Sequence, residues 1–232
     1  MKTSIANPRR AAAATAFAVL LLANASARAM ELRVAEDQIV MSGLVEGNEL
    51  RRLQLLLDEN AGKITTIILK NSPGGDAWTG FRVGELIREK GLRTGVSGYC
   101  ESSCSRMFLG GKERHFTDDQ PAAKTWVGFH GNYDSYGVLE PPAVIGRLKD
   151  WVIKHLDGKA DEALVDRWVR IANRRGFAHF FDAKRLNRPD GISVFLCQGP
   201  EARKMQDCEK IPGKDAYALG VATSSEVIKV KP

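Results

Sequence analysis

Short apolar strands and helices alternate through the middle of this chain, and this alternation constrains the fold more than any other feature. Residues 64–69 form a β-branched apolar run that is too short for a helix and continuous enough to be buried on both faces. A helical pattern over 77–90 follows, and apolar runs at 92–97 and 125–130 flank a second helical pattern over 102–109. Because βαβαβ order produces parallel strands, the sequence predicts an α/β fold with a mainly parallel sheet flanked by helices.

The remaining pattern adds elements at both ends of this core. Small residues at positions 77, 80 and 84 share one face of the first helix and predict that it packs closely against a neighbour. The other expected elements are a strand pair over 32–41, helices over 47–60, 142–155, 160–173 and 215–219, and strands over 192–197 and 220–223.

The first 29 residues are typical of an export signal. Basic residues at positions 2, 9 and 10 precede an uncharged apolar run over 11–23, and Ala27-Arg28-Ala29 has the small-x-small pattern of a cleavage site before Met30. The alternative is a retained membrane anchor, but the run falls short of the ~20 residues that cross a bilayer. We therefore predict a signal peptide over 1–29 and a single domain over 30–232, located in the periplasm or secreted.

The net charge does not indicate nucleic-acid binding. The chain carries +6, but residues 1–29 contain four basic and no acidic residues, which leaves +2 for residues 30–232. The remaining basic residues are scattered among acids, which is typical of a solvated surface. After residue 29 no segment is long and apolar enough to span a membrane, so we expect no stable membrane insertion once the signal is removed.

Four cysteines follow the predicted cleavage site. An even number in an exported chain favours disulfides over zinc ligands, because the compartment is oxidising and the spacings differ from close C-x-x-C pairs. We predict that sequence neighbours pair, Cys100 with Cys104 and Cys197 with Cys208, although four cysteines allow three connectivities.

Two glycine-containing loops follow two strands at the same predicted edge of the sheet. The first is Ser72-Pro73-Gly74-Gly75 and the second runs over 98–104. Ligands bind in open α/β sheets just outside such strand ends, where glycines let the backbone approach a ligand and a helix-heading serine leaves backbone N–H groups free. Each loop taken alone is better explained as a turn or a helix N-cap, so only their combination with a strand ending at His130 predicts a site.

Residues 64–131 resemble the core of the Clp-protease/crotonase superfamily, which includes Clp-type proteolytic subunits and signal peptide peptidases. Asn71-Ser72-Pro73-Gly74-Gly75 is similar to the family's oxyanion motif, and residues 98–111 are similar to its nucleophile loop and helix. Val127-Gly128-Phe129-His130 is similar to the strand that carries its histidine. Small periplasmic Clp-protease-like proteins share the Cys-x-Ser-x-Cys loop that Cys100 to Cys104 forms here.

The resemblance assigns roles by position. Ser102 would be the nucleophile and His130 its general base, while the backbone N–H groups of Gly75 and Ser103 would form the oxyanion hole. The family's acid falls within a segment near 175–186, where no Asp aligns cleanly. Asp182 is the nearest candidate for the third member, and Asp190 and Asp215 are others.

Other reactive residue types have simpler explanations. His115, His155 and His179 are expected to pack in the core or at the surface. Cys104 is a rival nucleophile to Ser102, but a bridge to Cys100 is expected in an oxidising compartment, where it would rigidify the nucleophile loop.

These observations together predict an exported serine hydrolase, a peptidase, acting on a peptide or protein substrate through acyl transfer at Ser102. The first alternative is a catalytically degenerate binding module of the cell envelope, and the second is a crotonase-type thioester enzyme, which export disfavours. No G-x-x-x-x-G-K-[ST], H-E-x-x-H or Rossmann glycine motif occurs, so no nucleotide, metal or other cofactor is expected. The resemblance alone implies a homo-oligomer.

Overall fold

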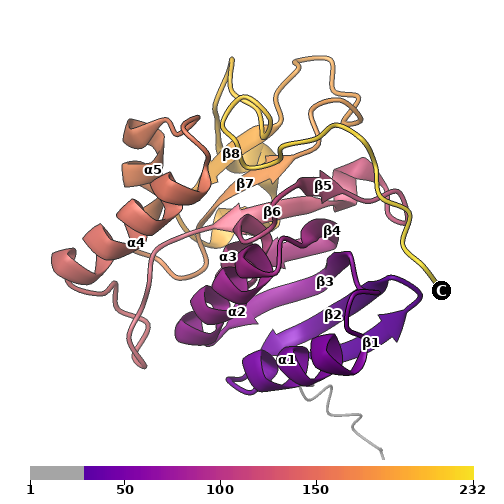
Figure 1. Cartoon of the computed structure of the whole chain (residues 1–232). Coiled ribbons are helices and arrows are strands. Elements are labelled where there is room, and N and C mark those ends of the chain that lie inside the picture. The colour runs from indigo at the N-terminus through magenta and orange to yellow at the C-terminus, as the bar shows by residue number, and fades with distance from the viewer. Residues whose placement is uncertain (1–28) are drawn as a thin grey trace, which may run out of the picture.

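The computed structural model describes residues 29–232, so the predicted signal peptide lies outside the described residues except for Ala29. One nine-stranded sheet organises the chain, in the order β1-β2-β3-β4-β6-β7-β8-β9 with β5 paired to β4 (Figure 1). The strands are β1 (Glu31–Ala35), β2 (Gln38–Val45), β3 (Thr66–Gly75), β4 (Arg93–Glu101), β5 (Arg114–Phe116), β6 (Trp126–Phe129), β7 (Phe177–Phe181), β8 (Val194–Cys197) and β9 (Glu209–Lys210).

The sheet combines a parallel centre with antiparallel edges. Strands β2, β3, β4 and β6 run parallel, as does β5 beside β4, whereas β1 pairs antiparallel with β2, and β6 through β9 alternate in direction. The predicted α/β class with a mainly parallel central sheet is confirmed by this strand order.

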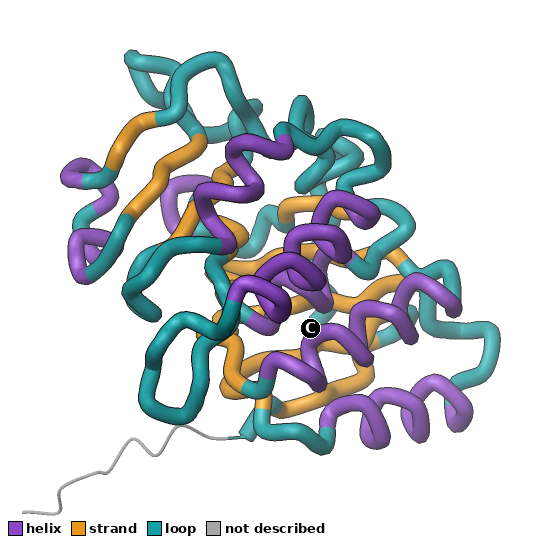
Figure 2. The backbone as a smooth tube through the Cα atoms, turned by 90° about the vertical axis from the view of Figure 1, so that its left-hand side faces the viewer, coloured by secondary structure: helices purple, strands orange, loops and turns teal. Residues whose placement is uncertain are grey.

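Five α-helices accompany the sheet in the described chain: α1 (Glu49–Glu59), α2 (Ala77–Glu89), α3 (Ser103–Leu109), α4 (Pro142–His155) and α5 (Glu162–Val169). Figures 1 and 2 show α1, α2 and α3 side by side against one face of the sheet, with α4 and α5 beyond α3. Among the described residues, no helix has both the length and the apolar character needed to cross a membrane.

Strand β3 is buried on both faces, as its composition predicts. Ile67 and Leu69 belong to the main core beneath the helices, while Ile68 packs on the opposite face with Ile228 and Val230 of the C-terminal segment. The chain end therefore covers the sheet face that the helices leave open, which explains why a continuous apolar run is required here.

Several predicted boundaries were wrong, and the glycine-rich loops account for two of them. Strands β3 and β4 continue through residues 71–75 and 98–101, which we predicted to be loops. Gly43, Asn71 and Gly98 interrupt three neighbouring strands with positive φ values of 105°, 47° and 69°. These bulges shift the register and let pairing resume, so each strand reaches further toward the site than its apolar run.

Three further strands, β5, β7 and β9, were not predicted, and two predicted elements are missing from the structure. Strands β5 and β7 were not predicted because their segments contain charged or aromatic residues instead of a β-branched apolar run. Residues 215–223 form turns and irregular backbone instead of the expected helix and strand. The buried Arg114 side chain donates hydrogen bonds to the carbonyl oxygens of Gly220 and Val221 in this segment. The predicted helix over 160–173 is shorter, ending at Val169.

Helices α2 and α3 touch backbone to backbone, as the small residues predict. A Cβ added at Gly80 would lie 2.5 Å from the Ser103 carbonyl oxygen, and one at Gly84 would lie 2.6 Å from that of Arg106. Neither carbonyl can move without moving α3. The two glycines therefore set the position of the short helix that follows Ser102.

Replacing Gly84 with alanine is expected to lower the free energy of unfolding by about 1–3 kcal/mol, because the new methyl group would overlap the α3 backbone. Gly146 provides a matched control within α4, since a Cβ there meets nothing within 4 Å. Gly146→Ala is expected to stabilise the protein by about 0.5–1 kcal/mol. Urea denaturation of both variants checks the pair, and equal stabilities would contradict the backbone contact.

Candidate active site

The register between β4 and β6 places Ser102 and His130 at the same end of the sheet. Glu101 pairs with Gly128, and the Ser102 N–H donates to the Gly128 carbonyl oxygen at 3.0 Å. Both strands end within two residues of this pairing, so Ser102 and His130 emerge together beyond the sheet edge. This is the strand-end location where open α/β sheets place ligands.

Ser102 and His130 are in direct contact. The Ser102 Oγ and the His130 Nε2 lie 2.7 Å apart, which is hydrogen-bond distance. Ser102 has φ 54° and ψ −124°, a backbone conformation that costs a non-glycine residue about 1–3 kcal/mol. The sharp turn directs the hydroxyl toward the imidazole, an arrangement in which an unprotonated nitrogen can accept the hydroxyl proton.

His130 is held by an aromatic and backbone environment. His130 is 8% exposed, and its ring stacks on that of Phe177 with centroids 4.3 Å apart. The Tyr133 ring makes an edge-type contact with it at a centroid distance of 4.9 Å. Burial lowers the pKa of His130 to about 3, and the positive charge of Arg106 acts in the same direction. The imidazole is therefore neutral at pH 7, leaving Nε2 able to accept from Ser102.

The glycine loop lies directly against the turn at Ser102. A Cβ on Gly74 would be 2.6 Å from the Ser102 Cβ and 2.9 Å from the Ser103 nitrogen, so only glycine allows this approach. Gly75 lines the same cavity as Ser102 and His130. The structure thus brings the backbone of Gly75 and the turn carrying Ser103 to the serine–histidine pair.

Both predicted disulfides are confirmed. Cys100 in β4 is bonded to Cys104 in α3, and Cys197 in β8 is bonded to Cys208. The first bond spans the turn that contains Ser102, and both of its cysteines are fully buried. Cys104 is consequently a disulfide partner rather than a free thiol.

Asp182 does not lie beside His130, which corrects its prediction as the third member of a triad. Strand β7 runs antiparallel to β6, so its first residue, Phe177, lies near His130, whereas Asp182 follows its last residue. The Asp182 carboxylate is 1% exposed and accepts a 2.7 Å hydrogen bond from the Tyr217 hydroxyl. The antiparallel direction of β7 was not evident from the sequence, and it moves this acid to the other end of the strand.

The other two acidic candidates, Asp190 and Asp215, also interact with residues outside the site. Asp190 forms ion pairs with Arg188 and Lys210, and Asp215 accepts from the backbone N–H groups of Tyr217 and Ala218. No carboxylate hydrogen-bonds to His130 within the described residues, and its Nδ1 has no hydrogen-bond partner there. The carbonyls of Gly176 and Arg174 nevertheless face the ring closely enough to oppose the lowering of its pKa.

The remaining histidines pack in the core, as predicted. His115 faces the Glu226 carbonyl oxygen at 2.9 Å, and His155 stacks on Trp151. His179 contacts the carboxylate of Glu101 at 3.2 Å. All three are about 1% exposed and lie outside the cavity that contains Ser102.

A cavity of about 380 Å³ surrounds the serine–histidine pair. Its lining includes side chains that the sequence analysis did not identify, namely Arg106, Asn132, Tyr133, Arg174 and Phe177. Arg106 could have been identified, because it is the one charged residue of α3 and lies four positions after Ser102. The others come from loops whose return to the site depends on the tertiary fold.

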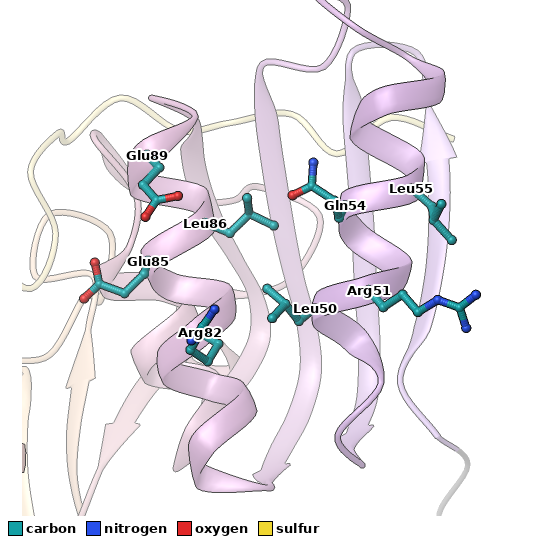
Figure 3. Close-up of a pocket in the computed structure, with 8 residues that line it drawn as sticks. All are labelled: Leu50, Arg51, Gln54, Leu55, Arg82, Glu85, Leu86 and Glu89. Atoms are coloured by element: carbon teal, nitrogen blue, oxygen red, sulfur yellow. The ribbon is translucent and has the colours of Figure 1, made fainter.

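Two other hollows lie on the helical face. The groove between α1 and α2 is shown in Figure 3, where Leu50 and Leu86 point toward each other across it. It shares no lining residue with the serine–histidine cavity. An apolar groove between α2 and α4 is lined partly by Ala77 and Asn132, which also border the cavity.

No cluster of side chains suited to a metal ion occurs among residues 29–232.

Comparison with solved structures returns proteases at low sequence identity. The chain is 14% identical to ClpP1 from Listeria monocytogenes, covering 84% of this chain and 92% of that one with a TM-score of 0.49. It is 12% identical to a membrane-bound stomatin-specific protease, covering 57% and 67% with a TM-score of 0.42. No protein-family model and no curated protein matches the chain.

The buried, neutral state of His130 makes stability depend on pH. An unfolded histidine has a pKa near 6.5, so between about pH 6.5 and 3 the unfolded chain binds a proton that folded His130 does not. The free energy of unfolding therefore falls on acidification through this window, and His130 contributes no pH dependence above it.

Urea denaturation of the wild type and His130→Gln at pH 7, 5.5 and 4.5 checks this expectation. The variant should lose less stability on acidification, with a difference approaching 1.4 kcal/mol per pH unit below pH 6. Burial also lowers the pKa of His155, but that residue is present in both proteins and cancels in the comparison. An NMR titration giving His130 a midpoint near 6.5 would contradict the assigned environment.

Proposed function

We propose that this chain is an exported serine hydrolase, a peptidase acting on peptide or protein substrates through acyl transfer at Ser102. The observation that carries the proposal is the 2.7 Å contact between the Ser102 Oγ and the His130 Nε2. A serine hydroxyl is a weak nucleophile unless a neighbouring base accepts its proton. The strained turn, the flanking glycines and the adjoining cavity support the same role.

In the proposed reaction, the Ser102 Oγ attacks the substrate carbonyl carbon while His130 Nε2 takes the hydroxyl proton. The backbone N–H groups of Gly75 and Ser103 stabilise the oxyanion, and each such donor is worth roughly 3 kcal/mol. His130 then delivers the proton to the leaving amine as the carbon–nitrogen bond breaks. Water, activated by the same imidazole, hydrolyses the acyl-enzyme and restores Ser102.

No acidic side chain is assigned to this mechanism. Because no carboxylate of the described residues hydrogen-bonds to His130, the proposed centre is a serine–histidine dyad whose imidazole ring stacks on Phe177. The backbone carbonyls of Arg174 and Gly176 face the ring and favour its protonated form, which is the form created when Ser102 attacks.

Export to the periplasm or the medium is part of the proposal. Two disulfides among the four cysteines suit an oxidising compartment, and residues 1–29 have the pattern of a cleavable signal. Removal of that signal leaves a single domain over 30–232. Assembly into a homo-oligomer is proposed from the family resemblance alone, and gel filtration of the exported protein tests it.

A catalytically degenerate binding module is the second candidate function. The observation that favours it is the low pKa of His130, about 3, because a general base works best when its pKa lies near the working pH. Such a module would keep the cavity for peptide binding without turnover.

Covalent labelling by a fluorophosphonate probe separates the two candidates. Protein recovered from the periplasm, with Met30 as its first residue by N-terminal sequencing, should be labelled at Ser102. Ser102→Ala should abolish labelling and reduce peptide hydrolysis by on the order of 10⁴-fold or more. Ser103→Ala is the matched control, since it keeps the backbone N–H and should retain labelling. Wild-type protein that resists the probe would leave only the binding function.

The disulfide at the nucleophile turn should matter for reactivity as well as for stability. Replacing both Cys100 and Cys104 with alanine removes the bond that spans Ser102 and is expected to slow labelling about 10- to 100-fold. Replacing Cys197 and Cys208 is the matched control. Both double variants should lose about 2–3 kcal/mol of stability, but only the first should lose reactivity. Equal labelling rates in the two folded variants would contradict a positioning role.

A further inference from the structure

Arg106 is a buried cation that forms no ion pair among the described residues. The residue is 3% exposed and lies one turn after Ser102 on α3. Its Nη2 donates to the Asn132 Oδ1, and its guanidinium lies over the Phe81 ring at 4.7 Å. Its Nη1 has no hydrogen-bond partner, and no carboxylate forms an ion pair with it within residues 29–232.

The carboxylate whose charge acts on Arg106 is that of Asp76, which hydrogen-bonds elsewhere. Asp76 raises the pKa of Arg106 through charge alone, while its side chain caps α2 by accepting from the Thr79 N–H at 2.7 Å. Burial lowers the pKa of Arg106 to about 10, so the side chain remains charged at neutral pH. A buried charge without a counter-ion is costly, and proteins usually pair it.

The position of Arg106 indicates what would pair with it. Arg106 lines the same cavity as Ser102 and His130, and Arg174 lines the exposed part of that cavity, with its side chain against Gly137. Asp134 is the one carboxylate among the lining residues, and its Oδ1 accepts from the backbone N–H groups of Tyr136 and Val138. The lining therefore carries two guanidinium groups and one carboxylate, and Arg106, whose Nη1 has no hydrogen-bond partner, is one of its buried residues.

We propose that this site selects substrates that carry a carboxylate beside the bond to be cleaved, held by Arg106 with Arg174 at the exposed side. This inference rests on the proposed function and names its substrate class. A guanidinium suits the task because its planar set of N–H groups matches a carboxylate. The carboxylate is either the C-terminus of a peptide or an Asp or Glu side chain, and the chemistry of recognition is the same.

Matched substrates distinguish these sources. One pair of peptides ends in a free carboxylate or an amide, and a second pair carries Glu or Gln next to the scissile bond. Wild-type kcat/KM is expected to be about 10- to 100-fold higher for the charged member of one pair. The pair that shows this preference identifies the source of the carboxylate. Equal rates within both pairs would overturn the inference while leaving the hydrolase intact.

Variants assign the preference to Arg106. Arg106→Gln should reduce the preference to within about twofold, and Arg106→Lys should keep only part of it because the planar donor set is lost. Arg174→Gln, at an exposed position, should reduce the preference by a smaller factor and does not disturb the core. Arg82→Gln is the control, since Arg82 lies outside this cavity against Trp78 and should keep the wild-type preference. An unchanged preference in folded Arg106→Gln would overturn the assignment.

Binding measurements separate failure of this inference from failure of the proposed function. Calorimetry with Ser102→Ala and the same four peptides reports affinity without turnover. A preference for the carboxylate peptide in binding, with no hydrolysis by the wild type, would remove the hydrolase and keep the carboxylate site. Hydrolysis with no preference in binding or turnover would keep the hydrolase and remove the carboxylate site.

Discussion

The parallel pairing of β4 with β6 is the constraint on which the rest of the site depends. It places the residue after β4 and the residue after β6 at one edge of the sheet, and the backbone hydrogen bond from Ser102 to Gly128 fixes their relative height. A one-residue slip would turn every side chain of β6 to the opposite face and move His130 away from the Ser102 hydroxyl. The serine–histidine contact is thus a consequence of register rather than of either loop.

Three features hold the Ser102 turn in its strained conformation. Gly80 and Gly84 allow α2 to touch the α3 backbone, Gly74 allows the glycine loop to touch Ser102 itself, and the Cys100–Cys104 bond closes the turn covalently. Each acts on a different side of the same few residues. A positive φ at a serine is maintained only where its surroundings over-determine it, and here they do.

The electrostatics of the site differ from those of a complete Ser–His–Asp triad. A buried carboxylate beside His130 would raise the pKa of the imidazole, whereas here burial and the nearby Arg106 lower it. The predicted acid, Asp182, instead accepts a hydrogen bond from Tyr217 at the other end of β7. The positive charge near the imidazole is the property that links the proposed hydrolase to the proposed preference for carboxylate-bearing substrates.

The sequence by itself determined the α/β class, the parallel core, the close packing of one face of α2 and the pairing of the cysteines. These follow from local signals, because β-branched runs, small-residue faces and short cysteine spacings act within a few residues of one another. The choice of Ser102 and His130 came from the family resemblance of the motifs around them. The tertiary structure alone decided the direction of β7, the bulges that extend β3 and β4, and the return of Arg174 and Phe177 to His130. Those depend on pairings between segments far apart in the chain, where periodicity carries no information about partner or direction.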